Sequence, residues 1–204
     1  MTAGYSFLVL ISACFIHSEV YTGKCGNDDV VGKVRPLLWA AEFNEEHAIL
    51  VEQGEKAFPA FLQILTAKDV KPIETARIFN VLAKVKIDRS QFLEHAILGL
   101  SHEHVSVRGT AVQLIAQIGS ARDIAPVVAL LSDTEWTNSV AAAKTLATIG
   151  DKRALAAMDV WLNSATPRNS VAEKANELLR TNLTKYRDEL KARLDKEKVK
   201  PPAK

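Results

Sequence analysis

The residues best suited to metal or acid–base chemistry are the histidines near position 102. The string His102-Glu103-His104 places two imidazoles two residues apart, and His95 lies seven residues upstream. A zinc-protease HExxH helix would need its second histidine at position 106, where the chain has Ser106. Because a third ligand at a clear spacing is missing, a polar turn between helices explains the string better than a metal site.

Other catalytic patterns are missing from the sequence. It has no glycine-rich phosphate loop, no GxSxG nucleophile motif and no cysteine–histidine pairing. Glu42, Glu45 and Glu46 share one predicted helix, and a solvated helix face explains them. Asn182 begins a glycosylation sequon, but a helix interior is a poor acceptor. We therefore expect no enzymatic activity, no cofactor and no bound metal.

The composition predicts that packed helices position these residues. The chain has 204 residues, enough for one domain with a sizeable core. Apolar residues make up 48% and aromatic residues only 6%, with alanine and leucine dominating, which favours helices over a β-sandwich. The formal net charge of +2 does not by itself imply an acidic partner.

Helical patterns recur along the chain with a period slightly above thirty residues. Gly54, Ile87, Gly119 and Gly150 occupy the same place in successive periods, at steps of 33, 32 and 31 residues. Two helical patterns per period are the signature of a helical solenoid. Each glycine lies just past a helix end, where we expect a left-handed residue. The first helices are predicted at 54–65, 89–100, 121–131 and 152–162, and the second helices at 71–85, 104–118, 136–149 and 168–179.

The fold class predicted is therefore all-α, a short α-solenoid of stacked antiparallel helix pairs over residues 34–194. A capping helix is expected over 36–53, with Pro36, like Pro72, near a helix start. A long C-terminal helix is expected over 169–194. Its apolar stripe favours a cap on the solenoid over a seam for another helix. The stripe consists of Leu179, Leu183, Tyr186, Leu190 and Leu194.

Residues 102–133 resemble a HEAT repeat, of the HEAT-like type also found in phycobilisome lyases. They carry the family's Val107-Arg108 pair, Ala111 and the glycine turn at Gly119. The next unit departs from the pattern, with Asn138 and Ser139 in place of the Val-Arg pair. The resemblance covers residues 54–180 and implies a fold rather than a chemistry.

The resemblance also implies a binding surface, because the second helices of this family line its concave face. Polar positions there carry amides and bases but no acids, which suits a protein segment bearing carboxylates. Two alternatives remain: the positions are simply solvated, and Arg108 pairs with a turn acid of the neighbouring repeat. Trp136 is either a binding anchor or packs over the adjacent repeat. The candidate residues are Arg77, Asn80, Lys84, Arg108, Gln113, Gln117, Lys144 and Thr148.

We accordingly predict an interaction or scaffold module that binds a protein through this concave face. The alternative, by resemblance alone, is a phycobilisome-lyase-like protein that handles a chromophore. Predicted export argues against it, because that work is done in the cytoplasm or stroma.

An apolar run at the N-terminus predicts export, to the outside of the cell or the periplasm. Residues 5–16 are uniformly apolar or small, too few for a bilayer span of about 20 residues but suited to a signal peptide. Cleavage is expected near Ser18, although residues 1–4 lack a Lys or Arg. Alternatives are a buried N-terminal helix, or a lipobox over 11–14 with lipidated Cys14. We assign 1–24 to the signal peptide and flexible arm and 25–33 to a linker. An unpaired thiol is expected at Cys25, with pairing between two chains as the alternative.

A basic tail closes the chain. From Lys185 to Lys204 there are eight Lys or Arg residues and four acids, and residues 195–204 are expected to be disordered. Nucleic-acid binding through this tail is a further hypothesis. The alternating charges over 191–196 argue against it, because they are typical of a solvated helix rather than a phosphate-binding stripe.

Overall fold

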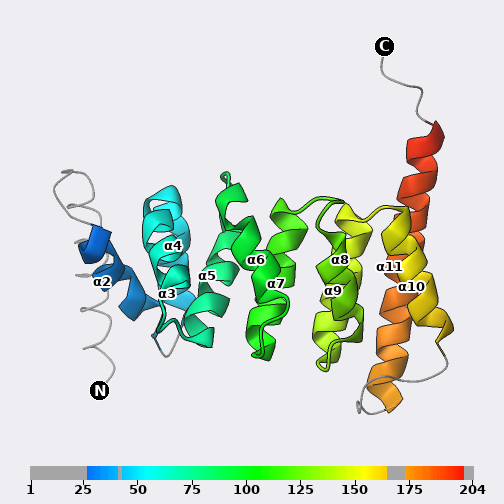
Figure 1. The fold of residues 1–204 in the computed structure, drawn as a ribbon, viewed down its shortest axis with the longest axis horizontal. Coiled ribbons are helices and arrows are strands. Elements are labelled where there is room, and N and C mark those ends of the chain that lie inside the picture. Colours follow the sequence, from blue (N-terminus) through cyan, green and yellow to red (C-terminus); the bar gives the residue numbers. More distant parts are fainter. Residues whose placement is uncertain (1–26, 41–42, 165–172, 200–204) are drawn as a thin grey trace. The chain divides into compact units, whose positions relative to one another are not determined.

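The computed structural model describes residues 27–40, 43–164 and 173–199, and the regular structure in those ranges is helical, with no strand. The chain divides into two compact units, residues 1–88 and residues 89–204, and each is described by itself. The predicted all-α class and the helix pairs are confirmed (Figure 1). The continuity of one stack over 34–194 stays a prediction.

Unit 1 packs its helices around a core of large apolar side chains. Helix α2 lies against α3 and α4, and α5 lies against α3 and α4. Leu38, Leu50, Phe61, Ile78 and Leu82 are completely buried there. The elements are α2 (Asn27–Leu37), α3 (Phe43–Gln53), a 3-10 turn (Gly54–Ala57), α4 (Phe58–Thr66) and α5 (Pro72–Lys84).

The start of unit 1 differs from the sequence-based expectation. Residues 27–33, expected in a linker, belong to α2, and the single helix expected over 36–53 is divided between α2 and α3. Pro36 lies in the last turn of α2 rather than at a helix start. Helix α2 forms because Val34, together with the leucines that follow it, is buried against its neighbours. Pro72 is at the start of α5, as predicted.

Unit 2 consists of three helix pairs that follow one another along the chain (Figure 1). The second helices pack side by side, with α9 between α7 and α11, while α8 and α10 contact each other among the first helices. Each pair places a first helix against its second helix. The elements are α6 (Leu93–Gly99), α7 (Val105–Ile118), α8 (Ile124–Ala129), α9 (Trp136–Ile149), α10 (Lys152–Asn163) and α11 (Glu173–Val199).

The close approach of α7 and α9 explains why the repeat pattern changes at position 138. The Asn138 amide donates to the Val105 carbonyl at 3.2 Å, and its Oδ1 would lie 2.6 Å from a Cβ placed on Gly109. Further along α9, the buried Thr145 hydroxyl donates to the Val112 carbonyl of α7 at 3.3 Å. Both side chains of α9 thus donate to backbone carbonyls of α7 across the helix contact.

Replacing Gly109 with alanine should therefore destabilise unit 2 by about 1–3 kcal/mol, the usual cost of overpacking. Urea unfolding followed by circular dichroism would measure it. Adding Asn138→Ala removes the clashing atom, so the double variant should lose less than the sum of the two single losses. The matched control is Gly32→Ala on α2. A Cβ at this position meets nothing within 4 Å, so this substitution should raise the free energy of unfolding slightly. Strictly additive losses would contradict the proposed clash.

The glycines at the helix ends are required for two different reasons, backbone conformation and space. Gly54 has a φ of 53°, the left-handed conformation predicted. Gly119 and Gly150 do not: their φ values are −80° and −70°. Glycine is needed there for space, because a Cβ on Gly119 would lie 2.7 Å from the Ile115 carbonyl oxygen and one on Gly150 would press on the Leu146 carbonyl.

Helix α11 closes unit 2 as a cap. Leu179, Leu183, Leu190 and Leu194 of the predicted stripe are buried, and α11 contacts both α9 and α10. Apart from Leu178 and Ala192, its exposed positions over 177–198 are polar, so the interpretation as a cap is favoured over a seam. Residues 195–199, expected in a disordered tail, continue the helix to Val199. None of the described helices combines the length and apolar character needed to cross a membrane.

Candidate partner-binding face

Four of the predicted binding residues form a regular exposed group, which we call the polar row: Gln113, Gln117, Lys144 and Thr148. Gln113 and Gln117 lie on α7, and the other two occupy the same places on α9, 31 residues later. All four are exposed. Within the described chain, Gln113, Gln117 and Lys144 have no side-chain partner, while the Thr148 hydroxyl donates to the Lys144 carbonyl at 3.1 Å.

The surroundings of the polar row carry almost no charge. The other exposed positions of α7 and α9 are Val105, Ser106 and Thr137, so Lys144 is the single exposed charge on these two helices. With amide and ammonium donors and no competing carboxylate, the surface favours a ligand rich in hydrogen-bond acceptors or negative charge.

Arg108 is a structural residue and does not join the polar row. Its Nε and Nη2 donate to the two carboxylate oxygens of Asp133 at 2.6 and 2.8 Å, and the side chains are 14% and 3% exposed. Its Nη1 also donates to the carbonyls of His102 and Glu103. The alternative role foreseen from the sequence, pairing with the turn acid of the next repeat, is confirmed.

The Arg108–Asp133 pair is an electrostatic link between two inter-helix turns. Burial alone would raise the pKa of Asp133, but hydrogen bonds from Arg108 and the Glu135 amide outweigh it and lower that pKa. The hydrogen bond with Asp133 in turn raises the pKa of Arg108. Both groups therefore stay ionised in the folded chain.

Arg77 has a comparable structural task in unit 1. Its Nη1 donates to the carbonyls of Leu38 at 2.7 Å and Ala40 at 2.8 Å, just beyond the end of α2. A cation there satisfies carbonyls that a helix end leaves open. Of the other two candidates on α5, Asn80 is half-buried and Lys84 is exposed.

Unit 1 contains a buried carboxylate that was not predicted from the sequence. Glu74 is completely buried and accepts hydrogen bonds from Arg35 Nε at 2.5 Å, Trp39 Nε1 at 2.9 Å and the Lys71 amide at 2.8 Å. Burial acts to raise the pKa of Glu74, but these donors together lower it. The signal available was Pro72 at the first helical position with a Glu two residues later, a pattern typical of a capped helix start.

The histidine string forms a helix cap, as the polar-turn interpretation predicts. His102 Nδ1 accepts the His104 amide at 2.9 Å, and His104 Nδ1 accepts the Ser106 amide at 3.3 Å, at the start of α7. Across the described ranges, no three His, Cys, Asp or Glu side chains gather closely enough to hold a metal ion.

The remaining sequence candidates are placed as follows. Glu45 is exposed as predicted, but Glu46 is only 8% exposed and its Oε2 has no hydrogen-bond partner, so a solvated face does not explain it. Glu42, Cys14 and Cys25 lie outside the described residues.

Trp136 is half-buried at the start of α9. The Asn182 amide donates to the Leu178 carbonyl within α11, which makes it a poor glycosylation acceptor.

Comparison with known proteins gives one finding that fits this geometry. Residues 93–180, from α6 into α11, match the family model described as HEAT repeats. A search of the curated proteins finds no match. The phycobilisome-lyase type stays a resemblance of the sequence.

Proposed function

We propose that this chain, which carries HEAT repeats over residues 93–180, is a scaffold that binds a protein partner through the polar row. The observation that carries the proposal is the repeated exposure of free amide and ammonium groups at equivalent positions of α7 and α9. Burying such donors without partners would be costly, so a bound segment must supply acceptors. Side-chain carboxylates and backbone carbonyls both meet that requirement.

The binding set that we propose is smaller than the one predicted from the sequence. Arg77 and Arg108 are held by contacts within their own units, so substituting them would test folding rather than binding. Lys84 and Asn80 on α5 remain candidates in unit 1. Gln113, Gln117, Lys144 and Thr148 remain the candidates of unit 2.

We expect Lys144→Glu combined with Gln113→Ala to lower partner affinity about tenfold, equivalent to about 1.4 kcal/mol, without changing thermal stability. The charge reversal places a carboxylate where acceptors of the partner must bind. Capture from the exported fraction by immobilised wild-type chain would identify the partner, and titration calorimetry would give its affinity. The matched control is Lys191→Glu on α11. Equal affinities for the double variant and the wild type would exclude the polar row.

We further propose that the chain is exported, supported by the apolar run over residues 5–16. Mass spectrometry of the mature N-terminus distinguishes cleavage near Ser18, lipidation of Cys14 and retention of the segment. An intact Met1 in every cell fraction would refute export and direct the search to intracellular partners.

A purely non-enzymatic role is part of this proposal, since HEAT repeats generally serve as binding surfaces. The alternative of a chromophore-handling protein rests on the resemblance of residues 54–180 alone. Co-expression with a bilin would distinguish the two functions. Visible absorbance from a bilin that remains bound to the purified chain would contradict the scaffold proposal and support chromophore handling.

A further inference from the structure

Trp39 is an exposed aromatic side chain that a hydrogen bond holds in one orientation. It lies just beyond the end of α2 and is 54% exposed, whereas the other aromatic side chains of the described residues are buried or half-buried. Its indole Nε1 donates to Glu74 Oε1 at 2.9 Å, and the same oxygen accepts from Arg35 Nε at 2.5 Å. Because Glu74 is completely buried on α5, this bond fixes the ring while more than half of the residue stays exposed.

An oriented, exposed tryptophan is suited to anchor a binding partner. Tryptophan is enriched among the residues that dominate binding energies, because it offers a large apolar area and has few rotatable bonds. The ring of Trp39 is already ordered by Glu74, so covering it costs little further conformational entropy. An exposed leucine alone would need no explanation, but Trp39 combines exposure with a buried hydrogen bond that orients it.

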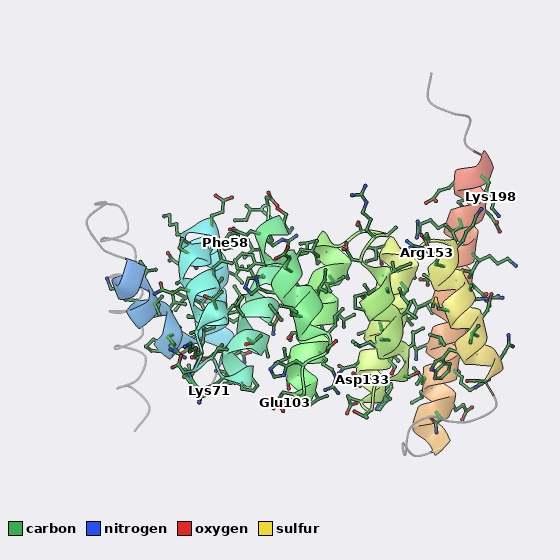
Figure 2. The ribbon with its side chains drawn as sticks, viewed as in Figure 1. Phe58, Lys71, Glu103, Asp133, Arg153 and Lys198 are labelled. Carbon is green, nitrogen blue, oxygen red and sulfur yellow. The ribbon has the colours of Figure 1, made fainter. Side chains whose placement is uncertain are left out.

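The turn between α4 and α5 brings two lysines to the same place. The Lys71 amide donates to Glu74 Oε2 at 2.8 Å, so the turn lies beside the carboxylate that orients Trp39. Lys68 and Lys71 are exposed, and neither ammonium group has a partner within the described part of the chain. Figure 2 shows Lys71 at one end of unit 1 and Phe58 at the opposite end.

The exposed charges of this turn favour a polypeptide that carries carboxylates. Asp69 is the single acid over residues 67–71, and its carboxylate is bonded to Arg35 Nη2 at 3.1 Å, whereas Lys68 and Lys71 are not neutralised. The Asp69 side chain is 68% exposed and has room to accept a further hydrogen bond. A polypeptide supplies main-chain N–H groups for it, while a phosphate backbone offers no such donor and would be repelled.

We infer that Trp39, Lys68 and Lys71 form a docking point for an acidic protein segment that places an apolar side chain against the indole. We call these three residues the tryptophan site. The lysines bind carboxylates that flank the apolar residue, and Asp69 accepts a main-chain N–H of the segment. The site belongs to unit 1 and lies outside residues 93–180, so it is separate from the polar row.

Peptide selection on the full chain tests the chemistry of the partner. A display library of short random peptides is depleted on the Lys68→Gln/Lys71→Gln variant and then selected on the wild type. The retained peptides should be acidic and carry an aromatic or large aliphatic residue, because they must match both the lysines and the indole. Recovery of basic peptides, or of none that distinguishes the two chains, overturns the inference.

Fluorescence anisotropy of a labelled retained peptide then measures its affinity. Lys68→Gln/Lys71→Gln and Trp39→Ala should each raise the Kd about tenfold or more. The matched control, Lys191→Gln/Lys196→Gln, neutralises two exposed lysines of α11 and should leave the Kd unchanged. An equal rise of the Kd in the control would show non-specific attraction and overturn the site.

The polar-row variant Lys144→Glu/Gln113→Ala separates this inference from the proposed function. It should bind the retained peptide with the wild-type Kd, because the tryptophan site is intact. A Kd that rises only in this variant would place the peptide on the polar row and overturn the tryptophan site. A Kd that rises only in the Lys68→Gln/Lys71→Gln variant supports the site, whatever the outcome for the polar row.

Nuclear magnetic resonance of the wild-type chain observes Trp39 without altering it. The chain has three tryptophans, and the indole N–H signal that is lost in Trp39→Phe belongs to Trp39. The retained peptide should shift this signal, whereas an oligothymidine single strand at the same concentration should not. An unshifted signal with bound peptide overturns the inference. A shift with the oligonucleotide alone also overturns it and assigns the site to nucleic acid.

Discussion

Replacing Asp133 with alanine is expected to lower the free energy of unfolding of unit 2 by about 3–5 kcal/mol. The substitution leaves the Arg108 guanidinium, only 14% exposed, without the carboxylate that receives two of its hydrogen bonds. It also removes the acceptor of the Glu135 amide. Urea unfolding followed by circular dichroism would measure the loss, and hydrogen exchange would place it in α7 and α9.

The matched control for this prediction is Asp151→Ala. Asp151 also accepts from an arginine, Arg153, and caps α10, but both side chains are much more exposed. Its loss should cost about 1 kcal/mol, the usual value of a helix cap. Replacing Arg108 and Asp133 together with apolar residues should cost less than the two single changes combined. A cost for Asp133→Ala no greater than that for Asp151→Ala would contradict the link between the turns.

The Arg108 link shows what the sequence could predict of this fold. The period of 31 residues located α7 and α9 and the polar row, because a helix repeats its faces at fixed spacing. The resemblance to HEAT repeats, rather than the period, supplied both possible roles of Arg108. Deciding between them required the position of the Asp133 carboxylate relative to the guanidinium, and no local rule gives that distance.

Helix α2 and Glu74 show what could not be predicted. The Arg35–Glu74 contact joins residues 39 positions apart, outside any repeat of the sequence. Pro36 indicated a helix start, yet Val34 and Leu37 are buried and extend the helix on both sides of it. Tertiary burial outweighs the local preference of proline here, since Pro36 lies in the final turn, where little of the helix remains to be disrupted.

Replacing Glu74 with glutamine is expected to destabilise unit 1 by about 2–3 kcal/mol. The fully buried carboxylate accepts from Arg35, Trp39 and the Lys71 amide, and a neutral amide cannot balance the guanidinium or accept all three bonds. Hydrogen exchange over α2 and α5 would measure the change. Asp69→Asn, which removes the exposed second carboxylate bonded to Arg35, is the control and should cost less than 1 kcal/mol.

Glu74 should also make unit 1 sensitive to acid, and the sign follows from its pKa. The folded chain lowers that pKa below its ordinary value of 4.5, so the unfolded chain binds the proton at higher pH. The carboxylate's contribution is therefore complete above pH 4.5 and is lost as the pH falls below it towards the folded value. Glu74→Gln should remove this slope from the pH dependence of unfolding, whereas Asp69→Asn should retain it. A variant with glutamine at position 74 that loses stability in acid as steeply as the wild type would show that other groups control the acid response.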